Sequence, residues 1–567
     1  MSSDHPHDHA HPHTHDHTPV EELPAALDMG VPDSELPPSA LGRRRFLQSA
    51  GLLGAGAAAL NVMGAGAAAA AETPARSARG AKVPKNGYTW LAGDHHIHTQ
   101  YSPDGLYRVI DQVQHGNAYG MDWLVITDHG TAQHTRIGVE RVNPDIVAAR
   151  RAIKDTLVFQ GLEWNIPAAE HGTVFVHPGR NEVSVLKQFE TDYDGSGGGR
   201  SAASPANEQA ARNGLIFLQQ AVTEKRVQDA MFFANHPARN GIDSPHEIRG
   251  WRDAAPAIAL GFEGAPGHQA AGLPAPAGPG AARGFYGNSP RPDSFPGYPP
   301  ESYRTFGGFD WMTSTVGGLW DSLIAEGKPW WITANSDSHR NYADTAQRGD
   351  EGFATNGFYA DPIYDPAGPN RTAGDYFPGF YSRTHVGARD FSYAAVMAAL
   401  RAGRSWVDHG RLLESLDVRL RAGGKEVPLG GTLTAKRGTP VTLSIRIMPA
   451  QLPNWSSFLP QLKKIDVIRG AITGPVTDQD ALAAPNTRVV RSYEVGASRV
   501  ITLNYALGRL DDQGFYVRLR GSDAKRVGVG LNGASVDPSG PVQDVVGDAD
   551  PWNDLWFYTN PMWILPV

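Results

Sequence analysis

The chain has no cysteine among its 567 residues. This absence excludes disulfide bridges and zinc sites built on thiolates, so any metal ion must be bound by His, Asp and Glu side chains. No large excess of positive charge is present either, because the net charge is -8, and we expect no nucleic-acid partner. The hydrophobic content of 41% and the charged content of 19% are typical of a soluble globular protein. At this length we expect two or more domains.

The N-terminal 71 residues are predicted to lie outside the fold. Histidine occupies every second position from 5 to 17, and this tract is either a metal-gathering tail or a compositional accident. Arg43 and Arg44 precede an uncharged run over 46–71 that resembles a twin-arginine (Tat) signal peptide, with cleavage near Ala71. A membrane anchor is the alternative, since the run is long enough to span a bilayer, but its Ala and Gly content favours a signal.

This N-terminus predicts a protein that the twin-arginine machinery exports in the folded state. After cleavage we expect no stable membrane anchor. The mature protein would be periplasmic, cell-wall associated or secreted, and a polar linker over 72–89 would precede its first domain.

One pattern recurs over residues 90–411: an apolar, β-rich run ends in an acidic or histidine cluster, and a helical stretch follows. The runs are TWLAGDHHIH, DWLVITDH, TLVFQGLEW, GTVFVHP, AMFFANHP, AIALGFEG and PWWITANSDSH. Strands that alternate with helices indicate an α/β fold with parallel strands, and seven are enough to close a TIM-like barrel. Insertions are predicted near 183–209, with a flexible loop over 191–209, and near 264–310, as a lid over the site.

Residues 412–567 have a different texture. Polar and apolar residues alternate between glycine turns, a pattern typical of a smaller, antiparallel, sandwich-like all-β domain. The chain ends in DADPWNDLWFYTNPMWILPV, where strand alternation puts Leu555 and Phe557 on one face and Trp556 and Tyr558 on the other. Because both faces are apolar, we expect a strand covered by protein on both sides rather than an exposed aromatic platform for a glycan.

Potential metal ligands cluster just after the first strand run, in GDHHIHTQYSPDG. His96 and His98 lie two positions apart, so on a strand both imidazoles face the same way and reach one ion. His95 points to the opposite face, where a structural role is expected. Asp104 lies on the turn beyond and can bend back toward the two histidines.

The other strand runs end in similar clusters. They contribute His129 in ITDHG, Glu163 in GLEWN, His171 in EHGTVFV, His236 in NHP, and Asp337 with His339 in SDSH. A single motif of this kind is common in structural loops, but five clusters at successive strand ends are hard to ascribe to chance. These are too many ligands for one ion, so the sequence predicts two or three ions bridged by a carboxylate.

Taken in order, HHIHTQYSPDG, ITDHG, GLEW, NHP and SDSH resemble the motifs of the PHP (polymerase and histidinol phosphatase) superfamily, over residues 91 to about 411. The resemblance implies a distorted (β/α)7 TIM-like barrel, a trinuclear site for zinc, manganese or iron, and phosphoester hydrolysis. It assigns one ion to His96, His98, Glu163 and Asp337, a second to Glu163, His171 and His236, and a third to Asp104, His129 and His339. Glu163 would be the bridge.

One ligand position is open, because the family pattern requires a histidine that leads into a strand. His171 fits, since TVFV follows it, and His177 before Pro178 is the rival. Asp128 and Asp94 are expected to support neighbouring ligands by hydrogen bonds rather than to bind metal.

The function expected from these residues is an exported, metal-dependent phosphoesterase. It would cleave a small phosphomonoester or phosphodiester through a metal-bridged hydroxide, with Glu163 and Asp337 as the catalytic carboxylates. Arg239 and Arg340 are candidates to hold phosphate oxygens, although each is equally compatible with a surface ion pair. His268 would contact the substrate, donate a proton, or only order the second insertion.

Two other functions compete with this one. A carbamate or carboxylic ester hydrolase would use the same metals, and the aromatic insertion (Tyr298, Tyr303, Phe309 and Trp311) would suit its apolar leaving group. A cell-surface binding protein with a degenerate barrel is the third possibility, and the intact ligand set argues against it.

Overall fold

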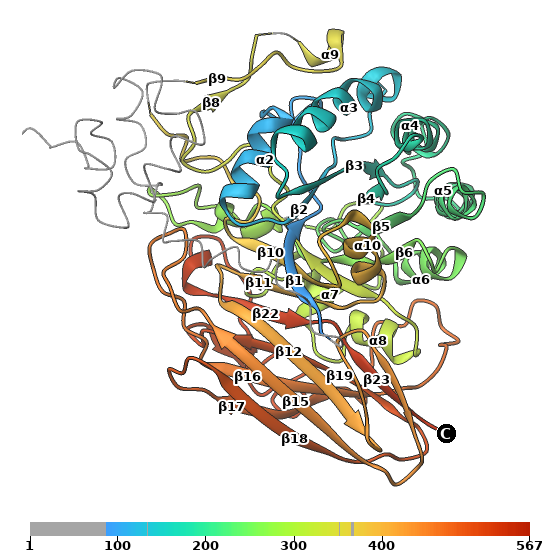
Figure 1. Ribbon diagram of the computed structural model, residues 1–567, viewed down its shortest axis with the longest axis vertical. Helices are drawn as coiled ribbons and strands as arrows, with labels where there is room; N and C mark the ends of the chain where they lie inside the picture. Colours follow the sequence, from blue (N-terminus) through green and yellow to red (C-terminus); the bar gives the residue numbers. More distant parts are fainter. Residues whose placement is uncertain (1–86, 133, 288, 351, 365–367) are drawn as a thin grey trace, which may run out of the picture. The chain divides into compact units, whose positions relative to one another are not determined.

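The computed structural model describes residues 87–132, 134–287, 289–350, 352–364 and 368–567, which are drawn in colour in Figure 1. These residues all belong to one compact unit of the chain, Ala57–Val567. The histidine-rich tail, the twin-arginine signal and most of the predicted linker lie outside the described residues. Within the described ranges, no helix combines the length and the apolar character that a membrane crossing requires.

All seven predicted runs form strands, and these strands pair with one another in sequence order. They are β1 (Thr89–Asp94), β2 (Trp123–Ile126), β3 (Leu157–Asn165), β4 (His171–Val176), β5 (Ala230–Ala234), β6 (Ala259–Ala265) and β7 (Trp331–Ala334). An isolated parallel bridge between Ile97 and Ser338 joins the segments that follow β1 and β7. Both ends of the strand series therefore meet at the place where the ligand motifs lie.

Helices cover the outer side of these strands (Figure 1). They are α2 (Val109–Ala118), α3 (His134–Ala152), α4 (Glu182–Tyr193), α5 (Pro205–Thr223), α6 (Pro245–Ala254), α7 (Trp311–Ser314) and α8 (Leu319–Ala325). In α5 the buried residues Ala211, Leu215 and Leu218 recur at helical spacing, which gives the helix one apolar face. That face packs against β5, as α6 packs against β6.

Strand β4 runs against its neighbours, so the expectation of a wholly parallel series is wrong at this strand. It pairs antiparallel with both β3 and β5, whereas β1–β2–β3 and β5–β6–β7 are parallel. Only residues 166–170 separate β3 from β4. A parallel return needs a crossover of a dozen or more residues, so a connection this short leaves only a hairpin.

Helices occupy both ends of the first predicted insertion, so the loop expected over 191–209 is shorter than predicted. Helix α4 ends at Tyr193, and α5 begins at Pro205. The start of α5 is set by Ser204, whose side chain accepts a hydrogen bond from the Asn207 N–H at 3.2 Å, and by the proline in the first turn. Only residues 194–204 remain as a connection.

In the described part of the second predicted insertion, the elements after β6 are short 3-10 helices: η3 (Gln269–Gly272), η4 (Arg283–Phe285) and η5 (Pro300–Tyr303). Asp310 anchors its end by accepting hydrogen bonds from the Tyr286 hydroxyl at 2.6 Å and from the N–H groups of Ala238 and Met312 at 3.0 and 2.7 Å. Burial raises the pKa of Asp310 to about 6 in spite of these donors.

A long segment after β7 carries the small elements β8 (Ala346–Gln347), α9 (Phe353–Asn356) and β9 (Ile363–Tyr364). Beyond it, β10 (Ser382–Ala388) pairs antiparallel with β1, and α10 (Tyr393–Arg401) leads into β11 (Ser405–His409). Strand β11 pairs in turn with β22 (Trp556–Thr559). One mixed sheet therefore continues from the α/β region into the C-terminal all-β region, across the boundary predicted at 411.

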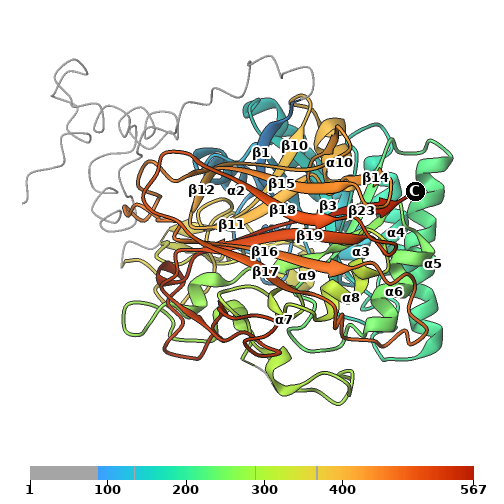
Figure 2. The same cartoon turned by 90° about the horizontal axis from the view of Figure 1, so that it is seen from below.

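Two sheets face one another in the all-β region (Figures 1 and 2). The smaller sheet is antiparallel and consists of β12 (Leu413–Ala422), β13 (Lys425–Val427), β15 (Pro440–Pro449) and β18 (Ile501–Arg509). The larger sheet adds β14 (Thr432–Ala435), β16 (Lys464–Ala471), β17 (Arg488–Glu494), β19 (Phe515–Ser522) and β23 (Met562–Pro566) to β22. Buried side chains of both sheets, such as Ile445 and Val467, share one hydrophobic cluster, which is the packing expected of a sandwich. The remaining elements are β20 (Val527–Gly528), β21 (Gly540–Pro541) and η6 (Pro551–Asn553).

The aromatic C-terminal strand β22 is covered on both faces, as its sequence predicts. Leu555 and Phe557 belong to the hydrophobic cluster of the sandwich. Trp556 and Tyr558 belong to the cluster that includes the strands of the α/β region. All four side chains are fully buried, so this segment holds the two regions together and offers no exposed aromatic platform.

Candidate metal centre

Histidine and carboxylate side chains from three strand ends converge below the surface. The Nε2 atom of His96 lies 3.0 Å from Oε1 of Glu163 and 3.0 Å from Oδ1 of Asp337. The Nε2 atom of His98 lies 3.1 Å from Oε2 of Glu163 and 3.2 Å from the same Asp337 oxygen. Ligands about 2.1 Å from a shared ion stand roughly 3 to 3.5 Å from one another, so this spacing fits a metal site. All four residues are buried.

Glu163 is the hub of the cluster. Besides His96 and His98, its carboxylate contacts His129 Nε2 at 3.1 Å, His171 Nδ1 at 3.3 Å and His236 Nε2 at 3.3 Å. These histidines come from the ends of different strands and surround both carboxylate oxygens. A single carboxylate in this position can bind two ions at once, which is the bridging role that the family resemblance implies.

A further group of ligands lies around Asp104. Its Oδ2 atom lies 3.2 Å from His129 Nε2 and 3.4 Å from His339 Nε2, and His98 Nδ1 lies 4.0 Å from Oδ1. Asp104 is the most exposed member of the cluster, with 45% of its side chain accessible. This group therefore forms the open side of the centre.

The described residues place every predicted ligand in a group able to hold a metal ion. The groups are His96, His98, Glu163 and Asp337; His98, Asp104, His129 and His339; His129, Glu163 and His171; and Glu170, His171 and His236. Three buried atoms of the cluster have no hydrogen-bond partner, namely Asp337 Oδ1, His171 Nδ1 and His236 Nδ1. Buried polar atoms that stay unpaired are costly, and two of them, Asp337 Oδ1 and His171 Nδ1, lie close to other ligand atoms without hydrogen-bond geometry. The donor set fits divalent cations.

The pKa values of Glu163 and His96 also favour a bound cation. Burial disfavours the charged carboxylate, yet His129 and His96 hold the pKa of Glu163 well below its ordinary value. Burial likewise disfavours the imidazolium form of His96, yet Asp337 and Glu163 raise the pKa of His96 well above its ordinary value. The carboxylates thus favour positive charge at a site that is shielded from solvent. A bound cation supplies that charge and displaces protons from the histidines.

Three residues of the centre have strained backbone conformations. His236, His268 and Asp337 have positive φ angles of 32°, 54° and 48°. Such conformations cost about 1–3 kcal/mol each and persist only where the surroundings impose them. At His236 the backbone N–H donates to Glu263 Oε2 at 2.8 Å, which holds the strained turn in place.

Asp94, Asp128 and His95 lie next to the ligand cluster, in positions that fit the supporting roles predicted for them. Asp94 accepts hydrogen bonds from the His96 N–H at 2.9 Å and the Ser336 N–H at 2.9 Å. Asp128 accepts from the Thr99 N–H at 2.6 Å. His95 points away from the cluster, where its Nε2 lies 2.8 Å from the Thr333 hydroxyl and its ring stacks on Phe233.

The direction of β4 separates the two candidate histidines at its ends. His171 begins the strand and lies beside Glu163, whereas His177 follows the other end, with its Nδ1 atom 2.8 Å from the carbonyl oxygen of Pro178. Because β4 is antiparallel, its first residue lies at the level where β3 and β5 end. The structure therefore brings His171, not His177, to the cluster.

Three functional residues were missed by sequence reasoning. Glu263 Oε1 lies 2.7 Å from His96 Nδ1, and Asp375 accepts hydrogen bonds from the His339 N–H at 2.7 Å and the Arg340 N–H at 2.9 Å. Glu170 completes a ligand group next to His171. Glu263 stands near the end of the sixth strand run, so its position could have identified it from the sequence as part of the centre. Asp375 lies in an irregular segment, where no pattern marks it.

The predicted substrate contacts have different outcomes. Both ring nitrogens of His268 face carboxylates, Nε2 at 2.7 Å from Asp337 and Nδ1 at 2.5 Å from Asp375. Burial lowers the pKa of His268, but Asp337 and Asp375 outweigh it and raise that pKa to about 9. Arg239 faces the centre, with Nη2 3.8 Å from Glu170, whereas Arg340 is exposed.

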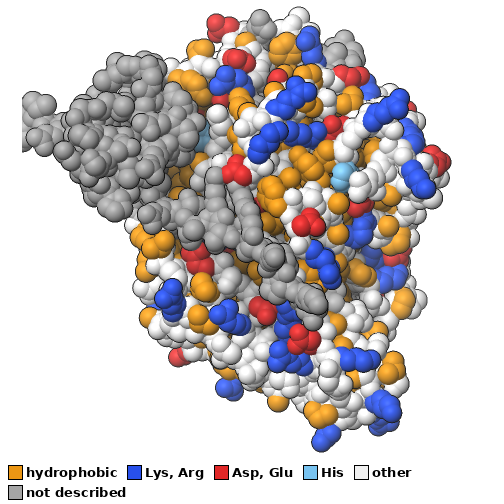
Figure 3. Space-filling model, viewed as in Figure 1, with side chains coloured by type: hydrophobic (Ala, Val, Ile, Leu, Met, Phe, Trp, Pro, Cys, Tyr) orange, Lys and Arg blue, Asp and Glu red, His pale blue; other side chains and the backbone are white. Residues whose placement is uncertain are grey.

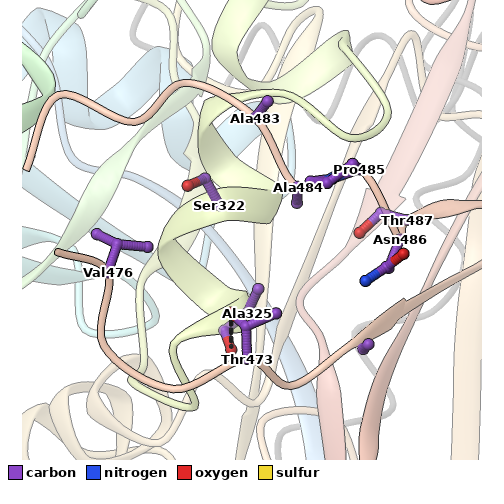
Figure 4. Close-up of a pocket in the computed structure, with 10 residues that line it drawn as sticks. Ser322, Ala325, Thr473, Val476, Ala483, Ala484, Pro485, Asn486 and Thr487 are labelled. Carbon is purple, nitrogen blue, oxygen red and sulfur yellow. Dashed lines mark hydrogen bonds between the residues drawn. The ribbon is translucent and has the colours of Figure 1, made fainter. Parts of the chain in front are cut away.

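The aromatic side chains of the second insertion do not line an open site. Tyr298, Tyr303, Phe309 and Trp311 are between 0% and 7% exposed and belong to the packed interior. A separate cavity of about 40 Å³ lies between α8 and residues 471–487 (Figure 4). No titratable side chain lines that cavity, so it adds nothing to the metal centre.

Comparisons with known proteins give one family match. Residues 94–213 match the family described as PHP domain, a span that includes six of the predicted ligands from His96 to His171. The match supports a PHP domain in this part of the chain. A solved structure from Bacteroides vulgatus, described as a two-domain protein containing a predicted PHP-like metal-dependent phosphoesterase, is similar over 81% of this chain and 97% of its own, at 15% identity and a TM-score of 0.33. No curated protein matches the chain.

Proposed function

We propose that this protein is a metal-dependent hydrolase of the PHP type that cleaves phosphomonoesters or phosphodiesters. The observation that carries the proposal is the position of Glu163, whose two carboxylate oxygens contact five histidines from four strand ends. A site built on one shared carboxylate suits a cluster of two or three ions. The PHP match over residues 94–213 supports the same reaction class.

The residues divide the work of binding metal. His96, His98 and Asp337 would hold one ion with Glu163, and His171 with His236 would hold another. The group of Asp104, His129 and His339 would hold a third on the open side. Ligands restricted to nitrogen and oxygen suit zinc, manganese or iron. When bound, such ions lower the pKa of coordinated water and neutralise charge on phosphoryl oxygens.

Other side chains would position the substrate and the ligands. Burial works against the charge of Arg239, but Glu170 and Asp337 raise the pKa of Arg239 above its ordinary value, so the guanidinium stays charged beside the centre. Its five donors suit the oxygens of a phosphoryl group. His268 fixes the orientation of Asp337 and Asp375 by hydrogen bonds to both.

A substrate panel tests the proposal. Metal-loaded protein should hydrolyse phosphomonoesters or phosphodiesters and leave aryl carboxylic esters and carbamates untouched. Arg239→Gln should lower kcat/KM for the preferred phosphoester by about tenfold or more, since a charge-assisted contact is lost. Arg226→Gln, a change in an arginine that packs on Phe217, is the matched control. Hydrolysis of aryl esters alone would refute the phosphoesterase proposal.

A further inference from the structure

Two arginines, Arg340 and Arg348, lie on the open side of the metal centre. The segment after β7 folds back onto the turn that carries Asp104. Tyr359 donates its backbone N–H to the Gln100 carbonyl at 2.9 Å and its hydroxyl to the Pro103 carbonyl at 2.7 Å. This segment brings Arg348 next to the Asp104 turn.

Arg348 is held in place but not neutralised. Its guanidinium lies over the Tyr359 ring, 4.4 Å from the centroid, and its Nε lies 3.5 Å from the Gly105 carbonyl oxygen. Its Nη2 atom is buried and has no hydrogen-bond partner among the described residues. A buried charged donor without a partner is costly unless a ligand satisfies it.

A second guanidinium adds to this unpaired charge. Burial and the neighbouring Arg340 lower the pKa of Arg348, whereas Tyr359 and Asp104 oppose that change. No ion pair joins Arg340 or Arg348 to a carboxylate in the part of the chain that the structure describes. The acidic group nearby is Asp104, and its charge is already shared with His129 and His339.

The two sides of the centre therefore carry different cations. Arg239 interacts with Glu170, Asp337 and Glu163, so it faces the hub where the ligand groups meet. Arg348 interacts with Asp104, at the exposed edge. A phosphoryl group bound at the hub would occupy Arg239 and leave Arg340 and Arg348 for something else.

We propose that Arg348, together with Arg340, binds a second anionic group of the substrate. The substrate would then carry two anionic groups, one phosphoryl group at the ions and one carboxylate or second phosphate at this arginine pair. The inference rests on the proposed phosphoesterase function, and it narrows the substrate class from phosphoesters in general to phosphoesters that carry a second anionic group.

Equilibrium binding tests this without relying on turnover. Isothermal titration calorimetry on the metal-loaded full chain would compare ω-phosphonocarboxylates of two to six methylene groups with alkylphosphonates of equal length. The C–P bond resists hydrolysis, so both sets report binding alone. At one or more lengths the phosphonocarboxylate should bind about tenfold or more tightly. The readout is the ratio of the two affinities, which a general loosening of the site would not change.

Variants test whether Arg348 causes this difference in affinity. Arg348→Gln should bring the ratio close to one, and Arg348→Lys should keep part of it because the charge remains. Arg469→Gln, which changes a guanidinium 3.9 Å from the Phe515 ring in the all-β region, should keep the wild-type ratio. Thermal melts of each variant check that it is folded.

The possible failures are distinguishable. If alkylphosphonates bind but phosphonocarboxylates show no preference at any length, the second anionic subsite is refuted and the phosphoesterase proposal stands. An unchanged ratio in folded Arg348→Gln refutes the role of Arg348. If neither set binds the metal-loaded protein, both proposals fall.

Discussion

The Nε2 atom of His96 lies 3.0 Å from Oε1 of Glu163, and neither side chain is reached by solvent. His96 follows β1, whereas Glu163 lies near the end of β3 and makes the same kind of contact with four further histidines. A buried carboxylate stays ionised only if positive charge lies close to it. Here that charge comes either from protonated imidazoles or from bound cations. We therefore expect the metal content of the protein to depend on this side chain.

Glu163→Gln should lose at least one bound ion and most of the hydrolytic activity, because the amide keeps the size of the side chain and removes its charge. Elemental analysis of wild-type protein should find two to three ions per chain. Glu182→Gln is the control, since the Glu182 carboxylate pairs with Arg150 at 2.8 Å and takes no part in the centre. A wild-type protein without metal after anaerobic purification, and without gain on adding Mn²⁺, Zn²⁺ or Fe²⁺, would contradict the metal assignment.

The two histidines at the ends of β4 offer a test within one strand. His171→Ala should weaken metal binding about tenfold or more in a competitive chelator titration, since it removes a ligand beside Glu163. His177→Ala should bind metal like the wild type, because His177 contacts the Pro178 carbonyl and the Tyr393 ring at the opposite end of β4. The reverse result would mean that the strand direction is misassigned.

Asp310 should make stability depend on pH. Its pKa is about 6 in the folded chain and about 3.9 when unfolded. A raised folded pKa means that the stabilising contribution is present below the unfolded value and is lost as the pH rises through 6. Asp310→Asn does not titrate, so its unfolding free energy relative to wild type should rise by up to about 3 kcal/mol between roughly pH 4 and pH 7.5.

Urea denaturation of metal-free wild type and Asp310→Asn at several pH values measures this difference. The lost hydrogen bonds of the variant shift both ends of the comparison equally, so only the slope with pH is informative. Parallel pH profiles for the two proteins would show that the carboxylate of Asp310 is not perturbed.

The C-terminal strand should be essential for folding. Trp556→Ala should lower the free energy of unfolding by about 3–5 kcal/mol, because it empties a fully buried site between the two hydrophobic clusters. Deletion of residues 551–567 should make the protein insoluble or sharply lower its melting temperature. Val567→Ala, at a position that is 78% exposed, is the control. A truncated protein that stays folded but no longer binds a cell-surface polymer would favour the platform function instead.

Export through the twin-arginine route remains a prediction from the sequence. We propose that the precursor is exported and then cleaved to the mature protein. Replacing Arg43 and Arg44 with lysine should leave the protein in the cytoplasm, and exported wild type should begin near Glu72. Cell fractionation with N-terminal sequencing measures both. An uncleaved form in the membrane fraction would favour an anchor.

Lysine, arginine and acidic side chains are interspersed across the face drawn in Figure 3, over both the α/β region and the all-β region. This mixed surface fits the modest net charge of -8.

Much of the architecture could be predicted because it depends on short-range periodicity. The pairing of His96 with His98 on one face follows from the two-residue repeat of a strand, and so do the two apolar faces of β22, with Phe557 on one side and Trp556 on the other. The seven strand runs were recognisable from their own residues. These features need no knowledge of where distant segments lie.

Other features were decided only by the tertiary structure. The reversal of β4 placed His171 at the centre, and packing between distant segments brought in Glu263, Asp375 and Arg348. The physical reason is that backbone geometry repeats over a few residues, whereas contacts across the site depend on strand order, strand direction and the path of irregular loops. By itself, the sequence determined which side chains were available for metal and on which face of each strand they lay. The fold decided which of them met at Glu163, and which cations were left to face the substrate.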